Sequence, residues 1–106
     1  MIVEYIRYHI DPCRNAEFDE AHRRAREYVD ASQHCRRWEA ARCADEPGKQ
    51  IVRIEWDPAE GHMQGFRQSP DFRAFVEATQ PFCEDIEEMT HYEVKLATLA
   101  VGSLSP

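Results

Sequence analysis

Apolar and polar residues alternate along residues 2–10, the period-two pattern of a β-strand with one buried face. The dipeptide Asp11-Pro12 ends this strand. From residue 14 to residue 31 the apolar positions recur at intervals of three and four, which predicts an amphipathic helix. One face of the strand carries Ile2, Glu4, Ile6, Tyr8 and Ile10, the other carries Val3, Tyr5, Arg7 and His9, and the apolar helix positions are Phe18, Ala21, Ala25, Tyr28 and Val29.

Two further strands are predicted at residues 35–43 and 50–56, joined by an acidic turn that contains Pro47-Gly48. Trp38 and Ala40 share one face of the first of these strands. In the second, Val52, Ile54 and Trp56 alternate with residues of the opposite face. The two strands are therefore expected to form an antiparallel hairpin whose apolar sides coincide.

Helical segments follow, each with a start signal of its own. Asp57 is a plausible N-cap, with Pro58 at the first helical position and Glu60 three residues after the cap. Ser69-Pro70 repeats the signal for a segment that carries Phe72, Phe75 and Val76, and Pro81 opens a short turn. A last strand is expected over residues 89–96. One domain is thus predicted at residues 1–96, with a C-terminal tail at 97–106.

The order β-α-β-β-α-β is that of the ferredoxin-like α+β fold with an antiparallel sheet. The apolar sheet face is where the helices should pack, because nothing else can cover it. The opposite face combines charged residues with Val3, Tyr5 and Ile51. It could either remain exposed to solvent or pack against a second sheet in a dimer. The predicted apolar face comprises Ile6, Tyr8, Trp38, Val52, Ile54, Trp56, Tyr92 and Val94, and the opposite face includes Arg7, His9, Arg37, Glu39, Arg53, Glu55, His91, Glu93 and Lys95.

Charge and composition exclude several classes of protein. The net charge is −7, and residues 54–106 carry ten acidic but only three basic groups, which argues against nucleic-acid binding. No apolar run is long enough to span a membrane, and Glu4 and Arg7 interrupt any secretory signal, so a cytoplasmic location is expected. Reduced thiols are expected for the four widely spaced cysteines, and no zinc-ligand spacing is present. An exposed acidic helix face is expected at Glu84, Asp85, Glu87 and Glu88.

The pattern resembles the antibiotic biosynthesis monooxygenase family of dimeric α+β-barrel proteins over residues 2–95. The resemblance is carried by the strand ending in Trp56, by Ser69-Pro70-Asp71-Phe72 and by Tyr92-Glu93-Val94. It implies homodimers whose sheets face one another, here through the face bearing Arg7, Arg53, Glu55 and Glu93. It also implies a pocket between sheet and helices. In some members that pocket oxidises phenolic or quinol-type aromatics with O2 and without metal or flavin; others degrade haem.

The chain departs from the family at two places. Many relatives carry a histidine where this chain has Phe66, and the nearest histidine, His62, lies one helical turn earlier. The haem-degrading branch has an asparagine in the first strand and a histidine late in the second helical segment, and this chain has neither. Haem degradation is therefore not expected.

Cofactor-free oxygenation requires a base for the phenolic proton, an apolar pocket and a group that stabilises developing charge. His62 is the candidate base and Arg67 the candidate anion partner, although both could be solvated helix residues. No metal or cofactor is expected. The candidate pocket walls are Trp38, Trp56, Phe66, Phe72 and Tyr92, although most aromatics at these spacings belong to a core.

Two functions follow from this chemistry. One is a cofactor-independent monooxygenase acting on a phenolic or quinol-type small molecule. The other is a non-catalytic dimeric module of the same fold, which binds a small ligand or serves a stress response. In a dimer His9 and His91 would lie at the interface and pair with Glu39, Glu55 or Glu93.

Overall fold

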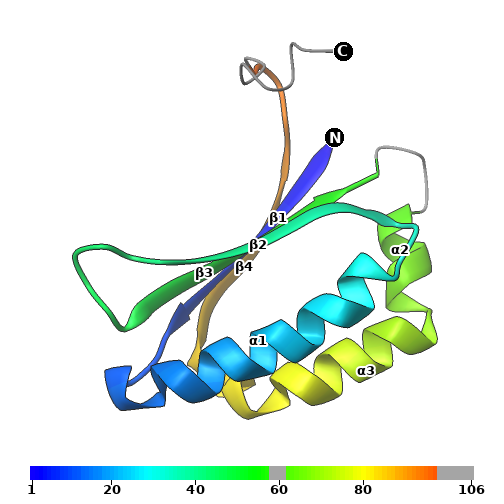
Figure 1. Ribbon diagram of the computed structural model, residues 1–106. Helices are drawn as coiled ribbons and strands as arrows, with labels where there is room; N and C mark the ends of the chain where they lie inside the picture. The colour runs from blue at the N-terminus through cyan, green and yellow to red at the C-terminus, as the bar shows by residue number, and fades with distance from the viewer. Residues whose placement is uncertain (58–61, 98–106) are drawn as a thin grey trace, which may run out of the picture.

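A computed structural model describes residues 1–57 and 62–97 of the chain, without the side chains of His62 and Met63. Figure 1 shows a sheet with helices on one side of it. The elements in chain order are β1 (Ile2–His9), the 3-10 turn η1 (Pro12–Arg14), α1 (Asn15–Asp30), β2 (Cys35–Arg42), β3 (Lys49–Trp56), α2 (His62–Arg67), α3 (Pro70–Thr79), the 3-10 turn η2 (Gln80–Asp85) and β4 (Ile86–Glu93).

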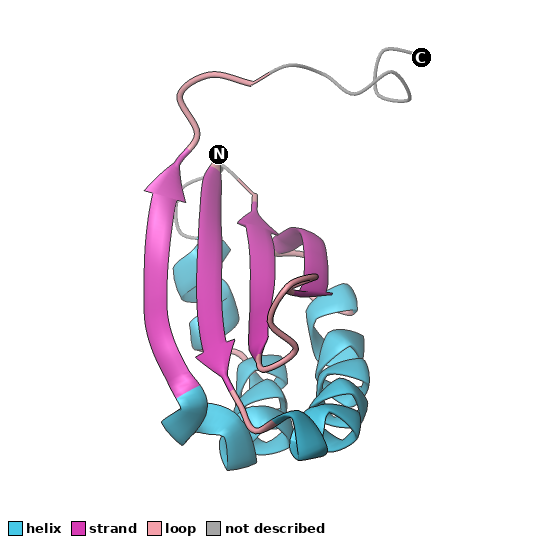
Figure 2. Cartoon of the chain, turned by 90° about the vertical axis from the view of Figure 1, so that its left-hand side faces the viewer, coloured by secondary structure: helices cyan, strands magenta, loops and turns pink. Residues whose placement is uncertain are grey.

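The four strands form one antiparallel sheet in the order β2-β3-β1-β4. The helices α1 and α3 lie side by side beneath the same sheet face, as both views show (Figures 1 and 2). This arrangement confirms the predicted ferredoxin-like α+β fold. The other sheet face is left without a covering layer in the described chain.

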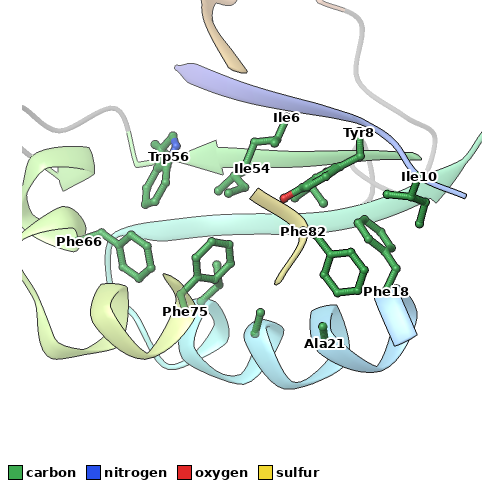
Figure 3. Close-up of a cluster of buried hydrophobic side chains, with 13 residues drawn as sticks. Ile6, Tyr8, Ile10, Phe18, Ala21, Ile54, Trp56, Phe66, Phe75 and Phe82 are labelled. Atoms are coloured by element: carbon green, nitrogen blue, oxygen red, sulfur yellow. The ribbon is translucent and has the colours of Figure 1, made fainter. Parts of the chain in front are cut away.

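The core lies between the sheet and the helices (Figure 3). Phe18 of α1 is its centre, with its ring stacked on His22 at 4.0 Å and meeting the edges of Tyr8 at 4.9 Å and Phe82 at 5.2 Å. Large aromatic rings bury the most apolar area per residue, so a domain of this size depends strongly on them. Of the rings around Phe18, Tyr8 also lines the cavity described below, as do Trp56 and its neighbour Phe66.

The helix start predicted at Ser69 is confirmed as the start of α3. Its side chain accepts a hydrogen bond from the Phe72 amide, and Pro70 occupies the first turn of α3. The start signal at Asp57-Pro58 falls on a segment, 58–61, outside the described residues. The Asp57 amide itself donates to the His34 carbonyl at 3.0 Å, which ties the residue after β3 to the residue before β2.

The last strand differs from its prediction in both range and phase. It begins at Ile86, so Glu87 and Glu88 lie on a strand, and the predicted acidic helix face is wrong. Antiparallel partners share a sheet face, and Tyr92 pairs with Val3 while His91 pairs with Glu4. Tyr92 therefore lies on the outer face, and His91 and Glu93 lie on the helix side, opposite to the prediction. A register shift opposite Arg7 and Tyr8 precedes this part of the strand: Tyr8 pairs with Ile86 and Arg7 with Glu88, so one residue of β4 is extra.

His22 makes stability depend on pH. It is 2% exposed, and Nδ1 lies 3.0 Å from the Phe18 carbonyl, a contact in which the neutral ring donates. Burial is the main cause that lowers the pKa of His22. The unfolded chain binds a proton near its ordinary pKa of about 6.5, whereas the folded protein does not, so stability falls as the pH drops below that value.

We expect the free energy of unfolding of His22→Phe to depend less on pH than that of the wild type, between about pH 7 and the lowered pKa of His22 in the folded protein. The slope should decrease by at most about 1.4 kcal/mol per pH unit. Urea unfolding of both proteins across that range measures the difference. The exposed residue His9 provides the matched control, as His9→Gln should leave the wild-type slope intact. If the free energy of unfolding of His22→Phe changed with pH as steeply as that of the wild type, the prediction would be contradicted.

Candidate functional site

A cavity of about 350 Å³ opens between the sheet and the helical layer. This volume is near the lower end of the 300–1,000 Å³ range that is typical of small-molecule sites, so a compact ligand fits it best. Nearly all of its surface is apolar, and the polar groups are few. It is lined by Glu4, Ile6, Tyr8, Ile54, Trp56, Phe66, Arg67, Phe72, Phe75, Val76, Thr79, Cys83, Ile86 and Met89.

A buried carboxylate marks one end of the cavity. Glu4 belongs to the helix-side face of β1 and is 5% exposed. Its Oε1 accepts a hydrogen bond from Trp56 Nε1 at 3.1 Å. Its Oε2 lies 3.6 Å from Arg67 Nη2 and 3.4 Å from His91 Nε2. Charges in an apolar setting persist only when they are paired, and Arg67 supplies that pairing here.

The nitrogen His91 Nε2 has two neighbours that require opposite forms of the ring. It lies 3.1 Å from Arg67 Nη2, a donor, and 3.4 Å from the Glu4 carboxylate, an acceptor. Without a proton Nε2 can accept from Arg67; with a proton it can donate to Glu4. His91 thus contacts both members of the Glu4–Arg67 pair and is partly exposed to solvent.

The opposite end of the cavity holds Tyr8, whose ring is packed against Phe18 and His22. Burial raises the pKa of Tyr8 far above its usual value, and electrostatic interactions with Cys83 and Glu4 add to the effect. Its phenol therefore stays protonated. Near it, the Thr79 hydroxyl is already committed to the Phe75 carbonyl at 3.0 Å.

The structure brings together four of the residues predicted for the pocket and separates the others. Trp56, Phe66, Arg67 and Phe72 all line the cavity, and the Phe66 ring touches those of Trp56 and Phe72 at 5.2 and 5.7 Å.

The remaining predicted site residues lie elsewhere or are not described. Trp38 packs against His22 on the far side of the core, and Tyr92 is 46% exposed on the outer face. Neither lines the cavity. His62 is the first residue of α2, and its side chain lies outside the described part of the structure.

Sequence reasoning missed Glu4 and His91. Glu4 could have been found, because it is a lone carboxylate on an otherwise apolar strand face. His91 could not, because its position near the cavity depends on the register of β4.

Neither metal-binding clusters nor membrane-crossing helices occur in residues 1–57 and 62–97. No three His, Cys, Asp or Glu side chains within these ranges gather as ligands for a metal ion. Of the helices there, none combines the length and apolar character needed to cross a bilayer. All four cysteines are free thiols.

Known structures share this fold over nearly the whole chain. A protein from Bordetella bronchiseptica assigned to the antibiotic biosynthesis monooxygenases is 24% identical, with a TM-score of 0.69, and the match covers 90% of this chain and 97% of that one. SnoaB from Streptomyces nogalater, a cofactor-independent oxygenase, is 13% identical with a TM-score of 0.73, covering 91% and 94%. At these identities the likeness shows the fold.

Sequence comparison gives the family. The uncharacterized protein YczJ of Bacillus subtilis is 24% identical over 93 residues, which are 88% of this chain and 98% of YczJ. The model of the antibiotic biosynthesis monooxygenase family matches residues 1–78. Since this match spans well over half of the chain, the protein belongs to the antibiotic biosynthesis monooxygenase family.

Proposed function

We propose that the protein is a cofactor-independent monooxygenase that oxidises a compact phenolic or quinol-type aromatic with O2. The observation that carries the proposal is the Glu4 carboxylate at the end of an apolar cavity, held by Trp56 and flanked by Arg67 and His91. Such chemistry needs a base, a cation and an apolar wall that excludes water.

Each residue has a defined part in this proposal. Glu4 accepts the phenolic proton, and Trp56 Nε1 fixes the direction of the carboxylate. Arg67 stabilises the phenolate and the charge that develops on oxygen. His91 passes the proton between Glu4 and solvent, because it contacts the carboxylate and is partly exposed. The rings of Phe66, Phe72 and Phe75 line the cavity against the flat face of the ligand.

The reaction balances without an added reductant. One oxygen atom of O2 forms a bond to a ring carbon, the O–O bond breaks, and the second oxygen leaves as water with two hydrogens of the quinol. A quinol and O2 thus give a hydroxyquinone and water, and the ring supplies all the electrons that O2 takes up.

Oxygen uptake with 1,4-naphthohydroquinone and anthrone tests the proposal, with heat-denatured protein as the blank for autoxidation. We expect uptake proportional to native protein and one ¹⁸O atom per product molecule when ¹⁸O2 is used. If neither compound gave oxygen uptake above the blank although it bound measurably, the oxygenase proposal would be rejected.

A second function is a binding module without catalysis. It is favoured by one observation: both Glu4 oxygens already have protein partners, as a carboxylate in a purely structural role would. The same experiment separates the two functions, since a binding module saturates with ligand but consumes no O2.

His62 remains a candidate base alongside Glu4. It stands at the start of α2, the helix that also carries Phe66 and Arg67 to the cavity. His62→Ala should lower turnover if its imidazole takes the phenolic proton. Full turnover in that variant would remove His62 from the mechanism and leave Glu4 as the base.

We also infer a homodimer through the outer sheet face, which carries Arg7, Arg53 and Glu55; Glu93, expected there, lies on the other side. Arg53 Nη1 pairs with Glu55 at 2.7 Å and its Nε donates to the Tyr5 hydroxyl at 3.3 Å. Because these charges are satisfied within one chain, covering this face leaves no lone ion buried.

Sedimentation velocity at micromolar protein should give twice the mass of one chain. Arg53→Glu should shift the protein toward monomer, because it places like charges beside Glu55. The control Arg73→Glu changes an exposed cation on α3 and should remain dimeric. A monomeric wild type would defeat the inference.

A further inference from the structure

The hydroxyl of Tyr8 is a polar group of the cavity that the proposed chemistry does not use. Tyr8 is 3% exposed and lines the cavity. Burial and charge are the influences on its phenol, and no hydrogen bond from another described residue is among them. Figure 3 shows that the oxygen points inward, toward Ile54. The buried polar atoms without a partner in the described part of the chain are His22 Nε2 and Trp38 Nε1. Tyr8 instead lines the cavity, so a ligand that fills the cavity can accept a hydrogen bond from its hydroxyl.

The ring is held in one orientation. Its contacts with Phe18, at 4.9 Å and 75°, and with His22, at 5.5 Å and 83°, are both edge-on and fix its plane. Since the phenol stays protonated, it can donate a hydrogen bond at physiological pH. A donor that is already oriented loses little freedom when a ligand binds.

Tyr8 and Glu4 mark two separate ends of the same cavity. They stand four residues apart on the same face of β1, which is about 13 Å along a strand. Glu4 presents an acceptor and Tyr8 presents a donor, and the cavity wall between them is apolar. A flat ring with an oxygen at each end matches this arrangement, whereas a ring with one oxygen leaves one end unsatisfied.

We propose that Tyr8 determines specificity by donating a hydrogen bond to a second oxygen of the aromatic ligand, so that the site selects rings oxygenated at opposite ends. This rests on the proposed placement of the ligand hydroxyl at Glu4. It needs no turnover, and binding alone can test it.

The test compares two matched pairs of probes, phenol with hydroquinone and 2-naphthol with 2,6-dihydroxynaphthalene, by titration calorimetry under argon. Wild-type protein should bind the dihydroxy member of at least one pair roughly three- to tenfold more tightly, as expected for one added hydrogen bond. Tyr8→Phe should lose this preference and unfold at the same or a higher urea concentration. Tyr28 lies on α1 and does not line the cavity, so Tyr28→Phe should keep the preference for the dihydroxy probe.

Cys83 reports where the probe lies, because its thiol lines the same cavity. The preferred dihydroxy probe should slow the reaction of Cys83 with N-ethylmaleimide, and Cys13 should react as before, since it lies on an exposed turn. Retention of the preference in Tyr8→Phe, no preference in wild type, or no protection of Cys83 would each overturn the proposal. A protein that shows the preference but consumes no O2 would support the role of Tyr8 and reject the oxygenase.

Discussion

Glu4→Gln is expected to lower kcat for an oxidised quinol at least 100-fold, the usual scale for loss of a general base. The amide oxygen can still accept from Trp56 Nε1, so the side chain keeps its position. What is lost is the ability to take a proton and the charge that faces Arg67. Steady-state kinetics with the best substrate of the oxygen-uptake panel measures the effect.

The control for this prediction lies on the same sheet face. Glu93 pairs with Ile2 in β4 but is exposed and does not line the cavity, so Glu93→Gln should retain wild-type kcat. Urea unfolding should show that Glu4→Gln is folded. A folded Glu4→Gln protein with wild-type kcat would exclude Glu4 as the base and return attention to His62.

Phe18→Ala is expected to destabilise the fold by about 3–5 kcal/mol, the range for removing a large buried ring. Phe18 is 1% exposed and contacts three other aromatic rings. A domain of this size has a total stability of about 5–15 kcal/mol, so the variant should be close to unfolding at 37 °C. Its effect reaches the site as well, because the Phe18 ring fixes Tyr8.

Equilibrium urea unfolding at 25 °C measures this loss. Leu96→Ala is the matched control: the residue is 94% exposed, and its truncation should change stability by less than about 0.5 kcal/mol. A loss under about 1 kcal/mol for Phe18→Ala would mean that the core closes around the gap or that this cluster is not its centre.

Much of the fold was predictable because its signals are local. The alternation in β1, the three-and-four spacing in α1 and the capping serine before α3 each follow from a few neighbouring residues. The chain order of these elements then leaves few ways to cover the apolar sheet face. The pocket itself was implied by the family resemblance, and of the residues assigned to it the cavity contains Trp56, Phe66, Arg67 and Phe72.

Two of the errors in the site, the placements of Tyr92 and His91, come from one edge strand. In β4 the apolar residues Ile86 and Met89 are three apart, yet both line the cavity, because the register shift opposite Arg7 and Tyr8 absorbs one residue. No local pattern shows such a shift. The sequence prediction took the phase of this strand from the apolar residues Tyr92 and Val94, which placed Tyr92 inside and His91 outside.

The sequence by itself determined most of the elements and their order, because periodicity, caps and turns are properties of adjacent residues. Only the tertiary structure decided which polar groups meet in the cavity. The cluster of Glu4, Trp56, Arg67 and His91 joins four elements, and its geometry depends on strand register and helix packing. The same holds for Tyr8: its alternation predicts burial, but the pairing of its hydroxyl depends on the neighbours that folding provides.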